Sequence, residues 1–219
     1  KNTFVVVIAS NLIGFTLAYG LSKKIPFRNF IRAAFYLPRL IGGVILGFVW
    51  QFIFLNIFPF LGDKLGWSVF QLAWLGTPGT AFWALAIVQA WGLAGYMMII
   101  YIAGLQNLPT DVLEAAEIDG ASSWQKLRRV TIPMIMPSIT ICTFLTLTNS
   151  FKLFDQNFAL TAGAPMKKTA MLALDIYNTF YGRIGDEGVG QAKAVLFFLM
   201  VAAIAALQLR ATRSREVEQ

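Results

Sequence analysis

The side chains that could bind or react lie in three short stretches of an otherwise apolar chain. Polar and aromatic residues interrupt two apolar runs, at residues 89–96 and 146–151, and a charged segment occupies residues 106–133. The sequence has no histidine and one cysteine, so the commonest metal ligand and the usual general base are missing. It also has no Gly-x-x-x-x-Gly-Lys-Ser/Thr sequence for a nucleotide and no carboxylate pair within an apolar run. These stretches favour a protein that binds and transports a ligand over an intramembrane enzyme.

The composition predicts a membrane protein. The chain is 57% hydrophobic and 13% charged, whereas soluble domains are about 45–50% apolar and about 25% charged. The net charge of +7 comes from short basic clusters between long apolar runs. This pattern disfavours a soluble domain, a disordered chain, a disulfide scaffold and a nucleic-acid-binding protein. We expect an all-α membrane protein, a polytopic helical bundle in contact with lipid.

A membrane-spanning helix needs about 20 mostly apolar residues. This length predicts five spans, at residues 4–22, 40–62, 81–105, about 130–151 and 194–209. Residues 33–38 form an apolar lead-in to the second span, broken by Arg39, and residues 67–75 are typical of an interfacial segment. The fifth span is short, so Lys193 and Arg210 should snorkel at its ends. The first run lacks a small-residue cleavage site, which favours a span over a signal peptide.

The density of basic residues near span ends predicts the orientation. Three compact clusters fall on one side, which we place in the cytoplasm: Lys23, Lys24, Arg28 and Arg32; Lys126, Arg128 and Arg129; Arg210, Arg213 and Arg215. The 106–133 segment and the tail at 211–219 then lie inside. Residues 152–193 lie outside, as a docking surface for an external protein, a helix that plugs the bundle, or both. An N-terminus outside without a signal predicts a further span upstream.

The 106–133 segment has the local signals of two short helices joined by a tight turn. Pro109 ends the third span, and Thr110 can cap a first helix. Gly120 can stop that helix in a left-handed conformation. Ser122 or Ser123 can cap the second helix. We expect a rigid helix–turn–helix that docks on another surface; the alternative is a solvated connecting loop.

Within this segment, one spacing of residues resembles a known motif: Glu114-Ala115-Ala116, three residues, Gly120, nine residues, then Val130-Thr131-Ile132-Pro133. It resembles the EAA loop of ABC importer permeases, whose pattern ends in Ile-x-Leu-Pro, and residues 114–124 are similar to the carbohydrate-importer branch. Residues 32–50 and 151–165 resemble further segments of the same family, with Ala164 in place of a glycine. The resemblance covers nearly the whole chain.

The resemblance implies a type I ABC importer transmembrane domain over residues 1–210, with five spans of a six-span core present. Such a permease does no chemistry and binds no metal or cofactor. It works with a second, homologous permease subunit, two cytoplasmic ATPase subunits that hold ATP and Mg, and an extracytoplasmic solute-binding protein. We expect a bacterial or archaeal cytoplasmic (inner) membrane and a sugar or oligosaccharide as cargo. The alternatives are a polyol, glycerol phosphate or another solute, and, more distantly, an ATP-independent channel or secondary transporter.

The resemblance also assigns candidate residues to two sites. ATPase coupling is expected at Glu114, Ala115, Ala116, Asp119, Gly120, Trp124 and Leu127. The substrate pathway is expected at Gln89, Trp91, Gly95, Tyr96, Asn149, Ser150 and Phe151. In the alternative interpretation Trp124 packs on its own bundle, and the polar residues only link helices.

Four further expectations come from the residues themselves. Arg39 should snorkel, Lys152 should pair with Asp155, and Cys142 should fill space in a span. Close helix packing is the expected role of six glycines: Gly14, Gly42, Gly43, Gly47, Gly92 and Gly95.

Overall fold

The computed structural model describes residues 1–22, 25–182 and 184–213. Helices and their connections make up this described part, in which no strand occurs. In chain order the elements are α1 (Asn2–Ser22), α2 (Arg28–Ile41), α3 (Gly43–Phe52), the π-helix η1 (Ile53–Ile57), α4 (Phe58–Leu65), α5 (Pro78–Gln106), α6 (Thr110–Ile118), α7 (Ser123–Lys126), the π-helix η2 (Leu127–Thr131), α8 (Ile132–Met134), α9 (Met136–Phe151), α10 (Asp155–Leu160), α11 (Leu172–Gly182) and α12 (Glu187–Arg213).

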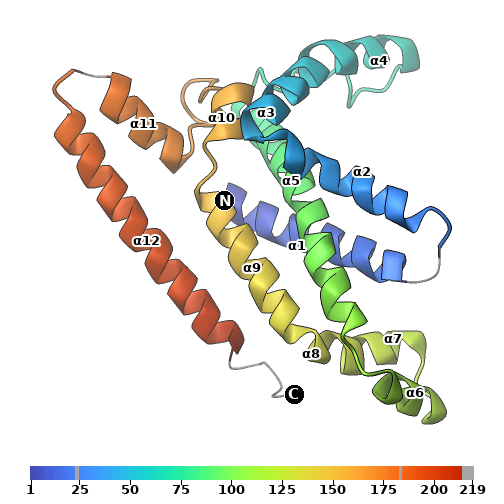
Figure 1. Ribbon diagram of the computed structural model, residues 1–219. Helices are drawn as coiled ribbons and strands as arrows, with labels where there is room; N and C mark the ends of the chain where they lie inside the picture. Colours follow the sequence, from blue (N-terminus) through green and yellow to red (C-terminus); the bar gives the residue numbers. More distant parts are fainter. Residues whose placement is uncertain (23–24, 183, 214–219) are drawn as a thin grey trace.

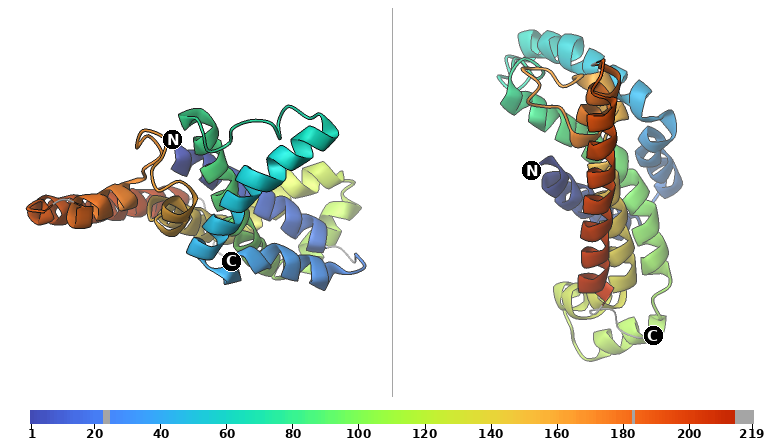
Figure 2. Two further views of the ribbon diagram at one scale, coloured as in Figure 1. Left: turned by 90° about the horizontal axis from the view of Figure 1, so that it is seen from above. Right: turned by 90° about the vertical axis from the view of Figure 1, so that its left-hand side faces the viewer.

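Helix α5 is the centre of the bundle. It packs along α1 and also contacts α2, α9 and α10, and it runs from the upper end of the molecule down to α6 (Figure 1). Most of α5 is buried, whereas α12 is largely exposed. Figure 2 shows α11 and α12 as an arm that projects from this core. An exposed apolar arm is typical of a helix that faces lipid or a partner subunit.

The lengths of the apolar helices agree with the predicted membrane-spanning helical bundle. Among the described residues, four helices are long and apolar enough to cross a bilayer: Asn2–Ser22, Gly43–Leu65, Pro78–Gln106 and Glu187–Thr212. A fifth span results if the bent pair Ser123–Met134 and Met136–Phe151, with its angle of 70°, counts as one.

The boundaries of three spans differ from the prediction. The lead-in at residues 33–38 belongs to a separate helix, α2, because Gly42 has a φ of 89° and breaks the chain there; the second span therefore begins at Gly43. The straight part of the fourth span begins at Met136. The fifth helix has 27 residues instead of the short run predicted. Its Lys193 does not end the helix but donates to Asp175 Oδ2 on α11 at 2.8 Å.

Two of the predicted inner regions lie at the same end of the molecule. Helices α6 and α7 and the end of α12 are at the lower end in Figure 1, and α4, α10 and α11 are at the upper end. The start of α2 lies at the right, at intermediate height. Four basic residues of the orientation argument or the outer segment fall outside the described residues: Lys23, Lys24, Arg183 and Arg215. The orientation stays a prediction.

Close helix packing is achieved at four of the six glycines. A Cβ on Gly14 would lie 2.8 Å from Met97 Cβ, and one on Gly95 would lie 1.8 Å from the Phe35 carbonyl oxygen. Gly43 and Gly47 similarly face Asp155 and Ala159 of α10, each with a Cβ distance of 2.6 Å. Gly42 instead has open space around it, and a Cβ on Gly92 would lie 3.3 Å from the flexible end of Leu46, a tight contact that is less close than at the other four. Cys142 is fully buried, as expected for a space-filling residue.

A buried polar network fixes the loop between α10 and α11. Asn157 is fully buried. Its Nδ2 donates to the Thr169 carbonyl at 2.9 Å and to Thr161 Oγ1 at 3.0 Å, and its Oδ1 accepts from the Met171 amide at 2.8 Å. Because one side chain satisfies groups on both ends of the loop, the loop should be rigid.

Replacing Asn157 with alanine is therefore expected to destabilise the protein by about 2–3 kcal/mol, because groups on buried Thr161 and Thr169 and on half-buried Met171 lose their hydrogen bonds. The measurement is the thermal unfolding midpoint of the purified protein in detergent. Asn178→Ala, on the neighbouring α11, is the control. Equal midpoints for the two variants would contradict a structural role for the network.

Candidate functional site

The 106–133 segment contains the two short helices α6 and α7, which lie at the lower end of the bundle (Figure 1). Helix α6 ends in a Schellman closure: the Ala121 amide donates to the Ala116 carbonyl at 3.0 Å, and the Gly120 amide donates to the Glu117 carbonyl at 3.0 Å. Gly120 has a φ of 75°. This conformation favours glycine, as the sequence predicted for the stop of the first helix.

Ser122 is the N-cap of the second helix, which settles the choice between the two serines. Ser122 Oγ accepts from the Gln125 amide at 3.3 Å, and Gln125 Oε1 accepts from the Ser122 amide at 2.7 Å, so the two residues form a capping box. The predicted cap at Thr110 is wrong. Pro109 occupies the N-cap position, and the Thr110 hydroxyl donates to Asp111 Oδ1 at 3.3 Å.

An ion pair between Glu117 on α6 and Lys126 on α7 holds the two helices together. The turn, the capping box and this pair all act within about ten residues, so the segment has a fixed shape. It then continues through η2 and α8 into α9 across the 70° bend. A displacement of the segment would therefore be transmitted directly to α9.

Loss of the N-cap should destabilise α7 when Ser122 is replaced but not when Ser123 is replaced. Ser122→Ala should destabilise the start of α7 by about 1 kcal/mol, because the Gln125 amide loses its acceptor. Ser123→Ala removes no cap and is the matched control. Hydrogen exchange of the amides of residues 123–126 measures the effect, with faster exchange expected for the Ser122 variant alone.

The outer surface of the 106–133 segment is unusually apolar for an exposed turn. Trp124 is 66% exposed, so most of its side chain does not pack on the bundle. Ile118, which the sequence analysis missed, is 86% exposed. It comes five residues after Leu113, on another face of α6, and this spacing was the available signal. Glu114, Ala115, Asp119 and Gly120 are exposed as well, and Ala116 and Leu127 are half-buried.

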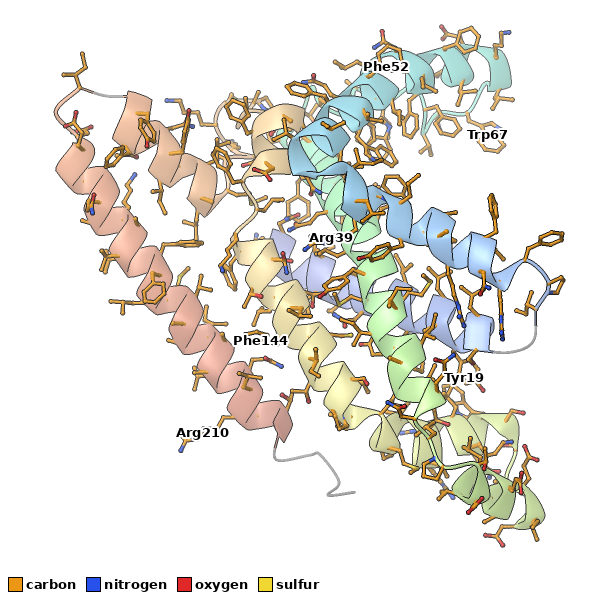
Figure 3. All side chains as sticks on the ribbon, viewed as in Figure 1. Tyr19, Arg39, Phe52, Trp67, Phe144 and Arg210 are labelled. Atoms are coloured by element: carbon orange, nitrogen blue, oxygen red, sulfur yellow. The ribbon has the colours of Figure 1, made fainter. Side chains whose placement is uncertain are left out.

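A second site is a polar cleft between the end of α2, the start of α3, α5 and the α9–α10 junction. Its volume is about 150 Å³. Its polar and charged walls are Arg39, Gln89, Asn149, Lys152, Asp155 and Gln156. Figure 3 shows Arg39 near the middle of the bundle, beside α5. We call this site the polar cleft.

The structure brings two of the predicted pathway residues to the polar cleft, Gln89 and Asn149. Gln89 is buried and also accepts from Asn2 Nδ2 at 3.0 Å, so it links α5 to α1 as well. Asn149 Nδ2 donates to the Leu145 carbonyl of its own helix at 2.7 Å. Gln89 thus links two helices, and Asn149 bonds within its own helix, in addition to their place in the cleft.

The other predicted pathway residues do not line the cleft. Trp91 packs edge-on against Trp50 with ring centres 5.5 Å apart, and Gly95 lies against the α2 backbone. Ser150 is buried without a hydrogen-bond partner for its hydroxyl, and Phe151 is the half-buried last residue of α9. Tyr96 lies behind the cleft, with its ring centre 5.2 Å from the Arg39 guanidinium carbon.

Three charged residues in the cleft were not predicted there. Lys152 and Asp155 form no ion pair within the described residues, contrary to the expectation from their spacing. The reason is that α9 ends before Lys152 and α10 begins at Asp155, so helical spacing does not apply across them. Arg39 lies over Tyr96 and lines the cleft, and its snorkelling stays a prediction. Only tertiary packing brings these three charges together.

The chain matches a known protein family over most of its length. The model of the family "Binding-protein-dependent transport system inner membrane component" matches residues 10–214. The chain is 50% identical to the "Probable starch degradation products transport system permease protein AmyD" of Thermoanaerobacterium thermosulfurigenes, over 97% of this chain and 72% of that protein. It is 31% identical to the trehalose/maltose transport system permease protein MalF of Thermococcus litoralis, over 97% of this chain and 72% of that protein.

Solved structures show the same fold. A bacterial ABC transporter involved in the import of the acidic polysaccharide alginate superposes with a TM-score of 0.81 at 21% identity, over 98% of this chain and 77% of that chain. The MetNI methionine ABC transporter superposes with a TM-score of 0.66, also at 21% identity, over 99% and 94% of the two chains. The expected type I ABC importer fold is confirmed. The chain belongs to the family of inner membrane components of binding-protein-dependent transport systems, the multi-pass membrane permeases of ABC importers.

Proposed function

We propose that this permease moves a sugar or oligosaccharide inward and that partner ATPase subunits drive it through the 106–133 segment. The observation that carries the proposal is the rigid, exposed shape of that segment, which presents an apolar and acidic surface beyond the end of the bundle. ATP and Mg bind to the ATPases, and this chain performs no hydrolysis. The 106–133 segment then lies in the cytoplasm, and the membrane is the bacterial or archaeal cytoplasmic membrane.

The coupling surface consists of residues on both short helices. Ala115 and Ala116 let an ATPase surface approach α6, Glu114 and Asp119 supply charge, and Gly120 sets the turn. Trp124 and Leu127 add apolar contact from α7 and η2, and Ile118 joins them. Because the segment continues into α9, closure of the ATPases would move α9 and the walls of the polar cleft as a rigid body.

A single aspartate at Ile118 should prevent this docking. The side chain is 86% exposed, so Ile118→Asp leaves the fold intact, but it places an unpaired charge in the proposed interface. We expect the amount of ATPase that co-purifies with the permease to fall by at least about tenfold. Ile184→Asp is the matched control, because that isoleucine is fully exposed at the other end of the molecule. ATPase binding that survives Ile118→Asp would argue against this interface.

The polar cleft is proposed as this subunit's part of the solute pathway. Its volume of about 150 Å³ is below the ~300–1,000 Å³ of small-molecule sites, so a second, homologous permease subunit would supply the facing wall. Gln89, Asn149 and Gln156 offer the amide groups that hydrogen-bond sugar hydroxyls. A solute-binding protein would deliver the cargo to the opposite end from the 106–133 segment.

The names of the relatives favour carbohydrate as the cargo. Permeases for starch degradation products, multiple sugars and trehalose or maltose are among them. Uptake into proteoliposomes that hold the complete importer tests this with α-glucan oligomers, a polyol and glycerol phosphate as the panel. Uptake of α-glucans that requires ATP supports the proposal. ATP-driven uptake of the polyol or glycerol phosphate alone would mean that this solute, and not a sugar, is the cargo. Uptake without any ATPase would favour a channel or secondary transporter.

A further inference from the structure

An aromatic groove lies at the end of the bundle opposite the 106–133 segment. It is bounded by α10, α11 and the start of α12, at the upper left of Figure 1. Its volume of about 430 Å³ falls in the range of about 300–1,000 Å³ found for small-molecule sites. Its larger lining residues are Phe154, Ile176, Tyr177, Phe180, Tyr181 and Gln191. We call this site the aromatic groove.

The rings of the aromatic groove form a continuous row. Phe154 lies 5.1 Å from Tyr177, Tyr177 lies 5.0 Å from Tyr181, and Tyr181 lies 4.8 Å from Phe180, as distances between ring centres. Tyr177 is 40% and Tyr181 72% exposed. The row therefore presents ring faces and hydroxyls to a ligand, and is not a closed core cluster.

The backbone of α12 makes room for this row. A Cβ on Gly190 would lie 2.9 Å from Phe180 Cβ, so the glycine allows α11 to approach α12 closely. Lys193 on α12 donates to Asp175 and Thr179 on α11, both at 2.8 Å. These contacts fix the two helices on which Tyr177, Phe180 and Tyr181 lie. The groove is thus held in shape from both sides.

Phe154 connects the aromatic groove to the polar cleft. Its side chain is part of the lining of both. A chain-like ligand in the groove could therefore extend past Phe154 to Arg39, Gln89 and Asn149 without leaving the protein surface. The two sites share a wall and so can hold two parts of one ligand.

The lining favours a neutral ligand with both apolar and hydroxyl-bearing faces. No charged residue is among the described side chains that line the groove. The headgroup of an anionic lipid would be met by basic residues, as lipid-binding sites are. A pyranose ring matches the groove better, because its C–H face stacks on an aromatic ring and its hydroxyls bond to tyrosine hydroxyls and the Gln191 amide.

We propose that the aromatic groove is a carbohydrate subsite that holds the distal sugar units of an oligosaccharide while its leading unit occupies the polar cleft. This inference rests on the proposed carbohydrate cargo. It predicts a dependence on chain length. A disaccharide needs the cleft alone, whereas a longer oligomer gains contacts with Tyr177 and Tyr181.

The test uses the double variant Tyr177→Leu/Tyr181→Leu in the complete importer, reconstituted with its solute-binding protein. Initial uptake rates are compared for maltose and for maltohexaose at subsaturating concentration. We expect maltohexaose uptake to fall by about tenfold and maltose uptake to stay unchanged, since stacking contacts are lost only for the longer sugar. Trp67→Leu is the matched control, because Trp67 is an exposed aromatic residue, 61% exposed, outside the groove.

Each other outcome has a separate meaning. Equal losses for both sugars, or the same pattern in Trp67→Leu, would show that these rings only anchor the protein in the membrane interface, and would overturn the inference. Unchanged uptake of both sugars would also overturn it. In each of these cases the wild-type importer still transports sugar, so the proposed function stands. If the wild-type importer moves neither sugar, the proposed cargo fails and the subsite fails with it.

Discussion

Replacing Gly120 with valine is expected to reduce ATP-driven uptake by more than about tenfold, because a β-branched residue in the left-handed region costs at least ~1–2 kcal/mol. Gly120 has a φ of 75°, and a Cβ built on it meets no atom within 4 Å. The expected effect therefore comes from the backbone alone and not from a steric clash. The turn would open, and α6 would lose its position relative to α7.

Asparagine at position 120 distinguishes an effect of backbone conformation from an effect of side-chain size. Asparagine adopts the left-handed conformation readily, so Gly120→Asn should keep most of the uptake. Both variants should still be found in the membrane in normal amounts, because the turn lies outside the bundle. ATP-driven uptake by proteoliposomes is the measurement. Wild-type uptake by the valine variant would mean that the shape of this turn is not used in coupling.

Replacing Gly95 with leucine should have the largest effect on stability. A Cβ there would lie 1.8 Å from the Phe35 carbonyl oxygen and 3.1 Å from Tyr36 Cα. Backbone atoms cannot rotate away as a side chain can, so α2 would have to separate from α5. We expect a cost of about 3 kcal/mol or more and little folded protein in the membrane.

The control for Gly95 is a helical glycine with free space. Gly20 lies near the end of α1, and a Cβ on it meets no atom within 4 Å. Gly20→Ala should leave the protein as stable as wild type or slightly more stable. The amount of monodisperse protein after detergent extraction and its unfolding midpoint are the measurements. A stable Gly95→Leu protein that fails only in uptake would instead support the pathway role of Gly95.

The sequence predicted the elements that depend on local signals. The long apolar helices, the stop at Gly120 and a serine cap for α7 follow from composition, φ preference and hydrogen-bonding groups within a few residues. The break at Gly42 and the extension of α12 to Arg213 did not follow. Gly42 breaks the chain with a positive φ of 89°, and Lys193 lies inside α12, where it pairs with Asp175 of α11.

The candidate site was predictable only in part, because most of it depends on tertiary contacts. Gln89 and Asn149 were chosen for being polar within apolar runs, and both reach the polar cleft. Trp91 and Gly95 were assigned to the pathway because the resemblance places their region there, but they face Trp50 and the α2 backbone. Helix rotation decides which residues of α5 face the cleft, and one sequence without its partners does not reveal it. The position of Phe154 between the polar cleft and the aromatic groove likewise depends on tertiary packing and does not follow from the sequence.

We expect the 106–133 segment to lie in the cytoplasm and to be held by an ATPase. Thiol labelling of Ala115→Cys in the assembled importer, detected on this chain, is the test, because Ala115 is exposed and the one cysteine in this sequence, Cys142, is fully buried. A membrane-impermeant reagent should label Ala115→Cys in inside-out vesicles and not in intact cells. Bound ATPase should block the labelling, and a bifunctional reagent should link the two subunits. Labelling from outside the cell, or full labelling while the ATPase is bound, would contradict the account.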